Sequence, residues 1–495
     1  MDYKKICNCD IIIIGDNMKK LNELMDCEYD VEITGVKINS REIEKGNLFV
    51  CTDQGTADRH NFIDDAISKG ASAVIVKRDV GEKSVPIIKV DNPNVYLPSL
   101  CSKFYDEPEK KLTMIGVTGT DGKTSVATMV QLLIGKDKCG YIGTNGYCCS
   151  KFDREIANTT PDADKLYMYF NDFLEAGCKY CSMESSSEAL RRGRLEGIMY
   201  DVAIHTNITS EHLNIHGTLE QYIKDKCKLF SQVKKDGYCI LNKDDEHFNE
   251  VYKASSGKVL TYGKDNSCDL YFKDVKLLPG KNYFTIVYKN KEYPIECPMA
   301  GYFNIYNLCA AILAMFALGY KFDDFKDKIH NIRVSGRLEL INRGQNFYVM
   351  VDYAHTPNGI TKLLEYVKLL PIKRSIVVIG QAGERDPYKR KDVGYIVCSN
   401  CDKAIFTYED PRSEDPRDII DMMLEKVKGK YDNYEIVIDR HLAIKRAIEI
   451  AREGDMVLIL GKGNETYEKL KDEVIYFNDI EEAEKALDEL MASDK

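Results

Sequence analysis

Short apolar runs that alternate with amphipathic helical stretches recur along the chain and predict an α/β protein. In the first hundred residues one helical stretch, at 62–70, separates the second apolar run from the third. In the last third the same rhythm is typical of a parallel, doubly wound sheet whose loops gather at the carboxyl ends of its strands. The runs lie at 31–38, 46–52, 71–77 and 85–90, and then at 347–354, 374–381, 403–410, 434–440 and 455–463.

The length of 495 residues indicates several domains, because single domains commonly hold ~150 residues. A charged stretch at 105–111 has the composition of a linker and predicts the first boundary. The next apolar run, at 112–117, leads through a glycine-rich turn into a helical stretch, and strands and helices continue to about residue 330. We therefore expect three domains, at 1–108, 109–332 and 333–495.

Composition narrows the class of protein further. Hydrophobic residues make up 44% and charged residues 30%, an ordinary globular balance that excludes a disordered or collagenous chain. The net charge of −10 argues against a protein that coats nucleic acid or an anionic membrane, so an anionic substrate would need local clusters of Arg and Lys. The apolar runs at 11–14 and 308–318 are too short for a signal sequence or a bilayer span, so we expect a cytoplasmic protein.

The 17 cysteines include two C-x-x-C pairs, Cys178/Cys181 and Cys398/Cys401. Neither pair has a flanking histidine pattern, and they lie more than two hundred residues apart in the chain. We favour buried reduced thiols over a shared zinc site, because free cysteine commonly behaves as a small buried hydrophobe.

The strongest local signal is the segment GTDGKT, which follows an apolar run and precedes a helical stretch. Backbone N–H groups at the start of a helix can cradle phosphates, a lysine can neutralise the β and γ oxygens, and a threonine hydroxyl can bind Mg²⁺. The spacing is a variant of the usual phosphate loop, because Val117 stands where its first glycine is expected. The predicted loop comprises Gly119, Thr120, Asp121, Gly122, Lys123 and Thr124.

This variant loop resembles that of the Mur ligase family, and ten further motifs occur in the order found in its MurE type, which adds the third residue of the peptide. The resemblance runs from residue 35 to residue 467, nearly the whole chain. It implies an N-terminal UDP-binding domain, a central P-loop ATPase domain and a C-terminal Rossmann-like domain that receives the amino acid. The motifs are INSREIEKGNLFV, NTTPD, MESSSEAL with GRLEG, TNITSEHLNIHGTLEQYIKDKCKLF, GYFNIYNLCAA, VSGRLE, VDYAHTPN, GERDPYKR, EDPRSEDP and GKGNETY.

The resemblance implies ATP-dependent amide formation. A carboxylate is a poor acylating agent, so the γ-phosphate of ATP first converts it to an acyl phosphate, which an amine then attacks. Gathering three anions requires Mg²⁺ and positive side chains. The implied partners are UDP-N-acetylmuramoyl-L-alanyl-D-glutamate and a diamino acid, without nucleic acid, and we expect a monomer.

The resemblance also assigns the metal site. Glu184 and His212 match the Mg²⁺-binding pair, and Lys226 matches a lysine that resembles a carbamylated ligand, N6-carboxylysine, beside Thr124 of the loop. By pattern alone Glu184 would be a surface carboxylate, His212 a structural hydrogen-bonding group and Lys226 a solvated lysine. A bare ammonium would repel Mg²⁺, whereas a carbamate supplies an oxygen anion.

Three further sets of residues match binding positions of the family. For the asparagines and for Asp352, helix capping or turn formation is the alternative from pattern alone. An arginine fork suits a substrate carboxylate, and a glutamate opposite can take an ammonium. The ATP set is Asn304, Asn307, Arg337 and Asp352, with His355 beside them; the UDP-sugar set is Ser40, Arg41, Thr159, Thr160, Ser186 and Arg194; the amino-acid set is Arg385, Asp410, Arg412, Gly461 and Glu465.

The chain departs from the family motifs at several positions. Asp410 replaces the asparagine typical of diaminopimelate enzymes, and a carboxylate there could compensate Arg412 and favour lysine. We favour meso-2,6-diaminopimelate and keep L-lysine open. The other departures are Glu188 and Asn464 in place of histidines, Ser210 and Glu211 in place of Arg-Asp, and Arg59 in place of the glycine before His60.

Two alternatives stay open. A folylpolyglutamate synthase belongs to the same wider superfamily, although the NTTPD, SSSEAL and EDPRSEDP blocks argue against it. A divergent paralogue that only binds a nucleotide or UDP-sugar would be expected to lose Lys123, Glu184 or Lys226 first. Because ATP ligands come from two domains, catalysis should require closure of the cleft between them.

Overall fold

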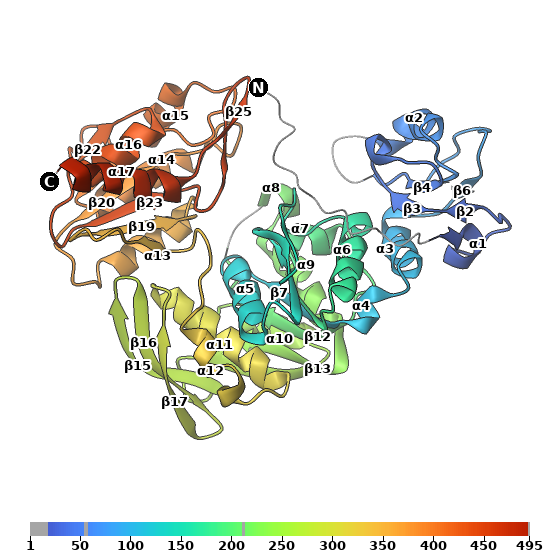
Figure 1. The fold of residues 1–495 in the computed structure, drawn as a ribbon, viewed down its shortest axis with the longest axis horizontal. Helices are drawn as coiled ribbons and strands as arrows, with labels where there is room; N and C mark the ends of the chain where they lie inside the picture. The colour runs from blue at the N-terminus through green and yellow to red at the C-terminus, as the bar shows by residue number, and fades with distance from the viewer. Residues whose placement is uncertain (1–17, 54–57, 210–212, 494–495) are drawn as a thin grey trace. The chain divides into compact units, whose positions relative to one another are not determined.

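The computed structural model describes residues 18–53, 58–209 and 213–493, which form two compact units (Figure 1). Unit 1 contains the chain up to Lys123 with residues 134–241 and 246–259; unit 2 contains residues 124–133, 242–245 and 260 onward. Among the described residues, no helix has both the length and the apolar character that a membrane crossing requires. The three domain boundaries expected above stay a prediction.

The N-terminal part of unit 1 is a four-stranded parallel sheet in the order β3-β4-β5-β6, with β4 at Asn47–Val50 and β5 at Ala73–Val76. Successive side chains of a strand face opposite sides. Phe49 and Val74 accordingly pack with helix α2 (Ile63–Ser68), while Leu48 and Ile75 join the core that includes helix α3 (Pro93–Phe104). The four predicted strands and the predicted helix are confirmed; the remaining elements are β1 (Lys19–Lys20), α1 (Leu21–Leu24), β2 (Glu32–Ile33), β3 (Gly35–Lys37), β6 (Ile87–Lys89) and α4 (Pro108–Lys111).

The larger sheet of unit 1 has the order β10-β9-β8-β11-β7-β12-β13. Strands β7 (Thr113–Thr118), β11 (Tyr180–Glu184) and β12 (Tyr200–His205) are parallel neighbours. Their register places Val117 opposite Glu184 and Thr118 opposite His205, so their carboxyl ends share one edge. The other elements are β8 (Cys139–Gly143), β9 (Gly146–Cys148), β10 (Asp153–Arg154), α6 (Ala163–Glu175), α7 (Ser187–Arg191), α8 (Leu213–His216), α9 (Leu219–Ser231), β13 (Val233–Asn242) and α10 (Phe248–Ala254).

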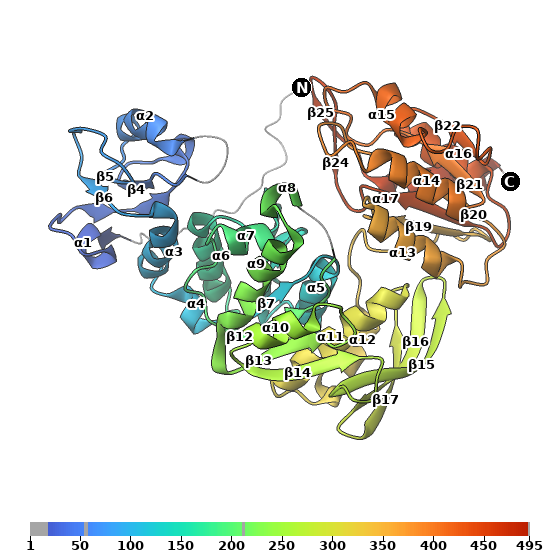
Figure 2. The same cartoon turned by 180° about the vertical axis from the view of Figure 1, so that it is seen from behind.

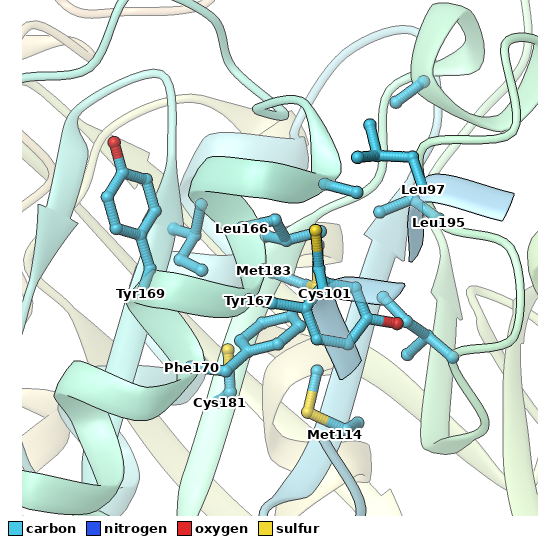
Figure 3. Packing of buried hydrophobic residues seen from close by; sticks show 14 of the residues in the cluster. Leu97, Cys101, Met114, Leu166, Tyr167, Tyr169, Phe170, Cys181, Met183 and Leu195 are labelled. Carbon is cyan, nitrogen blue, oxygen red and sulfur yellow. The ribbon is translucent and has the colours of Figure 1, made fainter. Parts of the chain in front are cut away.

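The core of unit 1 forms where α3 and α6 pack together and against this sheet (Figure 3). Cys101 of α3 lies beside Tyr167 and Phe170 of α6, with Met114 of β7 below them in the view, and Leu97 of α3 lies beside Leu195. Both C-x-x-C pairs lie in such apolar surroundings, with Cys178, Cys181 and Cys398 buried and Cys401 half-buried. The prediction of buried thiols is confirmed for three of the four, and no cluster of metal-binding type occurs among the described residues.

Unit 2 begins with most of helix α5 (Lys123–Ile134) and contains an antiparallel ribbon in the order β15-β16-β17. Helix α11 (Tyr302–Ala317) packs on this ribbon (Figure 2). The bounds are β14 (Lys258–Gly263), β15 (Leu270–Leu278), β16 (Lys281–Tyr288), β17 (Lys291–Cys297) and α12 (Lys326–Ile329).

The last part of unit 2 is a six-stranded sheet in the order β18-β19-β23-β20-β21-β22, parallel except at β18. Helices α13, α14 and α15 cover one face, and α16 and α17 cover the other (Figure 2). This is the predicted doubly wound, Rossmann-like arrangement. The bounds are β18 (Glu339–Ile341), β19 (Tyr348–Asp352), α13 (Pro357–Val367), β20 (Ser375–Ile379), α14 (Arg390–Asn400), β21 (Lys403–Phe406), α15 (Pro416–Met423), β22 (Tyr434–Ile436), α16 (Arg440–Glu449), β23 (Met456–Leu460), β24 (Tyr467–Lys469), β25 (Val474–Tyr476) and α17 (Asp479–Ser493).

Candidate functional site

The predicted phosphate loop lies between the end of β7 and the start of α5. At Gly119 no side chain fits, because a Cβ atom would lie 1.8 Å from the hydroxyl of Thr206. The Lys123 ammonium donates hydrogen bonds to the carbonyl oxygens of Gly119 (3.0 Å) and Thr120 (2.8 Å). The lysine thus folds over its own loop, in the position from which an ammonium can reach bound phosphates.

The segment after β12 holds this loop in place. The Asn207 carbonyl accepts the Thr120 amide (2.7 Å), and its side-chain oxygen accepts the Asp121 amide (3.0 Å). The Thr206 hydroxyl donates to the Asp121 carbonyl at 2.6 Å. We did not predict Thr206 or Asn207 from the sequence, although both belong to the motif that starts at Thr206.

Lys226 is buried on α9, and its ammonium donates to the Gly119 carbonyl at 2.6 Å. It also lies 4.4 Å from the centre of the Tyr222 ring. The alternative of a solvated lysine, which pattern alone favours, is therefore wrong. Burial next to the phosphate loop is the environment expected of a functional lysine, since a buried ammonium is otherwise costly.

Glu184 ends β11 and is fully buried, so the alternative of a surface carboxylate is wrong. Its Oε1 atom accepts hydrogen bonds from the Tyr141 hydroxyl and the Thr144 amide, both at 2.8 Å. A Cβ atom on Gly143 would lie 2.2 Å from the same oxygen, so a glycine is required beside it. Tyr141 and Thr144, which we did not predict, hold the carboxylate in place.

These residues fit Mg²⁺ in part. A buried carboxylate held only by neutral donors is a hard oxygen ligand of the type Mg²⁺ prefers, and a threonine hydroxyl is another. Lys226 as an ammonium cannot bind a cation and would have to be carbamylated to do so. The predicted ligand His212 lies outside the described residues, as do Ser210 and Glu211.

Four residues of the predicted UDP-sugar set lie together beside Glu184. The Thr160 hydroxyl donates to the Glu184 carbonyl at 2.8 Å and accepts the Ser186 amide at 3.1 Å. The Arg194 guanidinium donates to the Thr160 carbonyl at 3.0 Å, and the Thr159 hydroxyl lies 3.1 Å from that of Thr144. The structure thus brings Thr159, Thr160, Ser186 and Arg194 into one cluster.

The other two members of that set, Ser40 and Arg41, line a cavity of about 410 Å³ within unit 1. Ser40 is buried in the 3₁₀ turn Ser40–Glu42. Residues 156–158 and the start of α6, with the Asp164 carboxylate, also line this cavity. Burial raises the pKa of Asp164 to about 6. A cavity of this size is within the range of small-molecule binding pockets.

The predicted ATP set lies in unit 2. The Asn304 amide donates to the Ala300 carbonyl (2.6 Å), and the Asn307 amide donates to Asn304 (2.9 Å), so both asparagines order the start of α11. The Asp352 carboxylate accepts the backbone amides of Leu338 and Ala354, each at 2.8 Å. The strand-end role expected of Asp352 from pattern alone is therefore present, whereas Asn304 and Asn307 lie inside α11 and do not cap it. The nucleotide contacts of all three residues stay a proposal.

Arg337 of the same set lies close to the end of the phosphate loop. Its guanidinium lies 4.8 Å from the centre of the Tyr353 ring and donates to the Thr124 hydroxyl at 3.5 Å. An arginine placed in this way has further N–H groups with which to bind phosphate oxygens.

The predicted amino-acid set lies at the carboxyl ends of β21 and β23. The Asp410 carboxylate accepts a hydrogen bond from the Lys462 ammonium at 2.8 Å, and Glu465 lies 3.2 Å from the same ammonium. The Arg412 guanidinium donates instead to the Gly383 carbonyl at 3.0 Å. The interpretation that Asp410 compensates Arg412 is not supported by these contacts, because Lys462 is its cationic partner.

Burial and neighbouring charges shift the pKa values of Lys462 and Glu409. Burial lowers the pKa of Lys462, but the charges of Asp410 and Glu465 outweigh it and the net shift is upward. Burial raises the pKa of Glu409 to about 7, against the opposing charges of Arg440 and Lys462. Gly461 faces Glu409, since a Cβ atom there would lie 2.2 Å from its Oε2. We did not predict Glu409 or Lys462, although EDPR and GKGNE contain them; Arg385 is exposed.

Two of the departures from the family motifs have simple structural roles. Glu188 forms an ion pair with Arg192 at 2.8 Å, one turn further along the chain. The Arg59 guanidinium donates to the Thr52 hydroxyl at 2.5 Å, and its side chain also lines the cavity beside Ser40.

A phosphate loop at the carboxyl edge of a parallel sheet, a buried carboxylate beside it and a second doubly wound sheet with a cluster of charged side chains define a nucleotide-dependent α/β enzyme. Comparison with known proteins narrows this class. Residues 32–105 match the model described as "Mur ligase family, catalytic domain", residues 117–315 the "Mur ligase middle domain", and residues 336–463 the "Mur ligase, glutamate ligase domain".

The chain belongs to the Mur ligase family. It is 36% identical over 485 residues to a UDP-N-acetylmuramoyl-L-alanyl-D-glutamate–2,6-diaminopimelate ligase of Bacillus cereus, covering 94% of this chain and 98% of the relative. A protein of the same name from Clostridioides difficile is 36% identical over 469 residues, covering 94% of this chain and 96% of the relative.

Solved structures of ligases also match this chain over nearly its whole length. A structure of a UDP-N-acetylmuramoyl-L-alanyl-D-glutamate–2,6-diaminopimelate ligase matches with a TM-score of 0.69 and 28% identity, covering 96% of this chain and 99% of the other. MurF ligase from Thermotoga maritima in complex with ADP matches with a TM-score of 0.65 at 19% identity, covering 93% and 98%, and bears on the fold alone.

Proposed function

We propose that this protein is an acid–amino-acid ligase that uses ATP to join meso-2,6-diaminopimelate to UDP-N-acetylmuramoyl-L-alanyl-D-glutamate in peptidoglycan synthesis. The relatives that share more than a third of its residues over nearly their whole length carry that activity in their names. The observation that carries the proposal within this chain is the phosphate loop with two buried ionisable residues beside it, Glu184 and Lys226.

The phosphate loop is the binding place for the ATP phosphates. Its backbone amides and the Lys123 ammonium offset the negative charge that builds up as the γ-phosphate passes to the substrate carboxylate. The product of this step is an acyl phosphate, whose carbonyl carbon is attacked by the amine of the diamino acid, with inorganic phosphate as the leaving group. Arg337 and Asp352 are the proposed contacts from the last domain, and Asn304 and Asn307 those on the adenine side.

Mg²⁺, when bound, would offset the negative charge of the ATP phosphates and of the substrate carboxylate. Thr124, Glu184 and His212 are its proposed protein ligands. Lys226 contributes only after it has added CO₂ to its neutral amine, which gives the N6-carboxylysine carbamate and releases a proton. The Gly119 carbonyl and the Tyr222 ring hold the side chain of the unmodified lysine.

The UDP end of the substrate is proposed to occupy the cavity lined by Ser40 and Arg41, and the muramoyl peptide to contact Thr159, Thr160, Ser186 and Arg194. The position of this cluster is consistent with the proposed reaction, because the Thr160 hydroxyl donates to the backbone carbonyl of Glu184. A peptide carboxyl group that reaches Thr159 would therefore lie near the proposed metal ligand.

The choice of diamino acid is argued from Arg412. Its guanidinium donates one N–H group to the Gly383 carbonyl, and the Asp410 carboxylate is paired with Lys462. A guanidinium that keeps its charge and most of its donors suits the second carboxylate of meso-2,6-diaminopimelate, which L-lysine lacks. Arg385, Gly461 and Glu465 are the further proposed contacts.

The test is incorporation of radiolabelled amino acids into the UDP-linked dipeptide in the presence of ATP. We expect meso-2,6-diaminopimelate to be incorporated and phosphate to be released in equal amount. Incorporation of L-lysine alone would correct the substrate, and phosphate release with a folate but not with the UDP-dipeptide would overturn the proposal. Mass measurement of the peptide that contains Lys226, with and without bicarbonate, tests the carbamate separately.

A further inference from the structure

A buried network of three residues connects α7, α8 and α9. The Asp225 carboxylate lies 2.8 Å from Nδ1 of His216, and Nε2 of His216 lies 3.1 Å from the Ser187 hydroxyl. All three side chains are buried, with Asp225 0%, His216 3% and Ser187 5% exposed. Since a carboxylate accepts only, His216 donates from Nδ1, which fixes the orientation of its ring.

Asp225 has hydrogen-bond and ion-pair partners on α7, on α8 and on its own helix. Besides His216 it accepts hydrogen bonds from the Gln221 amide (3.1 Å), and it pairs with the Lys228 ammonium (3.0 Å) on its own helix. From α7, the Arg191 guanidinium reaches it at 3.5 Å and also donates to the His216 carbonyl at 3.2 Å. A buried carboxylate with this many partners resists displacement, because losing them would leave an uncompensated charge.

The same face of α9 holds the phosphate loop. Tyr222, Asp225 and Lys226 are three and four positions apart, so they lie on one side of the helix. The edge of the His216 ring meets the Tyr222 ring at a centroid distance of 5.0 Å. The Tyr222 hydroxyl lies 3.2 Å from that of Thr120, and Lys226 donates to Gly119. A continuous path of contacts thus runs from Ser187 to the phosphate loop.

A Ser–His–Asp arrangement can also belong to a hydrolase, in which the serine is a nucleophile. Here Ser187 is the first residue of α7 and is buried under His216, so a substrate carbonyl has no approach to its hydroxyl. The arrangement therefore serves position and not covalent chemistry.

We propose that Asp225 and His216 are positioning residues that hold α9 against the phosphate loop and so set the place of Lys226 and of the loop backbone. Asp225 neighbours Lys226 in the chain, and His216 is four residues from His212, so the pair joins the two segments that carry proposed metal ligands. The proposal rests on the proposed function only in that the loop must bind ATP.

The experiment uses Asp225→Asn, which keeps the shape and removes the charge. We expect kcat to fall about 10-fold to 100-fold, as on loss of other outer positioning partners, with little change in KM for the diamino acid. ADP should bind more weakly, and the backbone amides of residues 118–124 should exchange hydrogen faster. Ser187→Ala, which removes only the outer hydrogen bond, should move both measurements in the same direction by a smaller factor.

Glu109→Gln is the matched control, because Glu109 is a buried carboxyl group of unit 1 that accepts the Ser102 hydroxyl at 2.8 Å. It should lower Tm without changing loop exchange or ADP binding. If Asp225→Asn and Ser187→Ala lower Tm but leave ADP binding and loop exchange as in the control, Asp225 and His216 are merely structural and the proposal is wrong. ADP binding and loop exchange need no ligase activity, so failure of the proposed function gives a different result. Should Asp225→Asn fail to fold, Ser187→Ala alone decides.

Discussion

The Lys462 ammonium lies 2.8 Å from the Asp410 carboxylate, and both side chains are buried. Asp410 is the residue that departs most visibly from the diaminopimelate motif, and its partner comes from a turn fifty-two residues further along the chain. This pair joins the ends of β21 and β23 and leaves Arg412 to its backbone contact with Gly383. The departure therefore has a structural explanation that does not require a different amino-acid substrate.

Asp410→Asn should destabilise the protein while leaving the choice of amino acid unchanged. The Lys462 ammonium would lose its closest anionic partner, and its remaining ion pair would be that with Glu465, at 3.2 Å. We expect a loss of about 1–3 kcal/mol in the free energy of unfolding, measured by denaturant titration. A switch of preference between meso-2,6-diaminopimelate and L-lysine would instead show that Asp410 contacts the substrate directly.

Lys123→Ala should lower kcat by about 100-fold to 1,000-fold, because the loop would lose a charge that stabilises the transferring phosphoryl group. Circular dichroism should be unchanged, since among the described residues the Lys123 ammonium donates to the carbonyls of its own loop. Lys253→Ala, on the exposed side of α10, is the control and should keep full activity. If the unsubstituted protein showed no turnover, that result would support the alternative of a non-catalytic paralogue.

Arg412→Gln should raise KM for meso-2,6-diaminopimelate about 10-fold to 100-fold, the effect of losing a charge-assisted hydrogen bond of about 1.5–3 kcal/mol. Any incorporation of L-lysine should change much less, because lysine has no second carboxylate. Arg417→Gln, at an exposed position near the start of α15, is the matched control. Equal losses for both amino acids would contradict the assignment of Arg412.

Cys149 should react with iodoacetamide at a lower pH than an ordinary thiol. A hydrogen bond from the Cys178 thiol, aided by the Lys151 amide at 3.4 Å from the sulfur, lowers the pKa of Cys149 to about 6. Cys149 is buried, so labelling will be slow, but peptide mass spectrometry should show a labelling midpoint below that of an ordinary thiol. Cys178→Ala should move the midpoint upward by removing the donor. An unshifted midpoint at 8 or above in the unsubstituted protein would contradict the arrangement.

Asp172→Asn should stabilise the protein at neutral pH more than at pH 4. Burial raises the pKa of Asp172 to about 6, while Tyr147 and Arg154 oppose the shift. The folded state therefore holds a proton that the unfolded state releases near pH 4, and stability declines as pH rises between these values. Asparagine removes this decline and can still accept the Tyr147 hydroxyl, 3.3 Å away. Parallel pH dependence of Tm in both proteins would refute the burial argument.

Local patterns predicted much of the fold. The strands and helix of the first hundred residues and the parallel sheet of the last third follow from alternating apolar runs, whose faces the packing of Phe49 and Leu48 on opposite sides confirms. The phosphate loop was also predictable, because its glycines, lysine and following helix are contiguous in the chain. The roles assigned to Glu184 and Lys226 needed the motif resemblance, since by pattern alone a glutamate at a strand end and a lysine in a charged helix belong on the surface.

The sequence by itself determined where strands, helices and the phosphate loop form, because those depend on neighbours within a few positions. Only the tertiary structure decided that Lys226 is buried against Gly119, that Asp225 pairs with His216, and that Asp410 binds Lys462. The physical reason is that the energy of a charged side chain depends on burial and on which opposite charge lies within hydrogen-bonding distance. Both are set by how distant segments pack, and no local pattern carries that information.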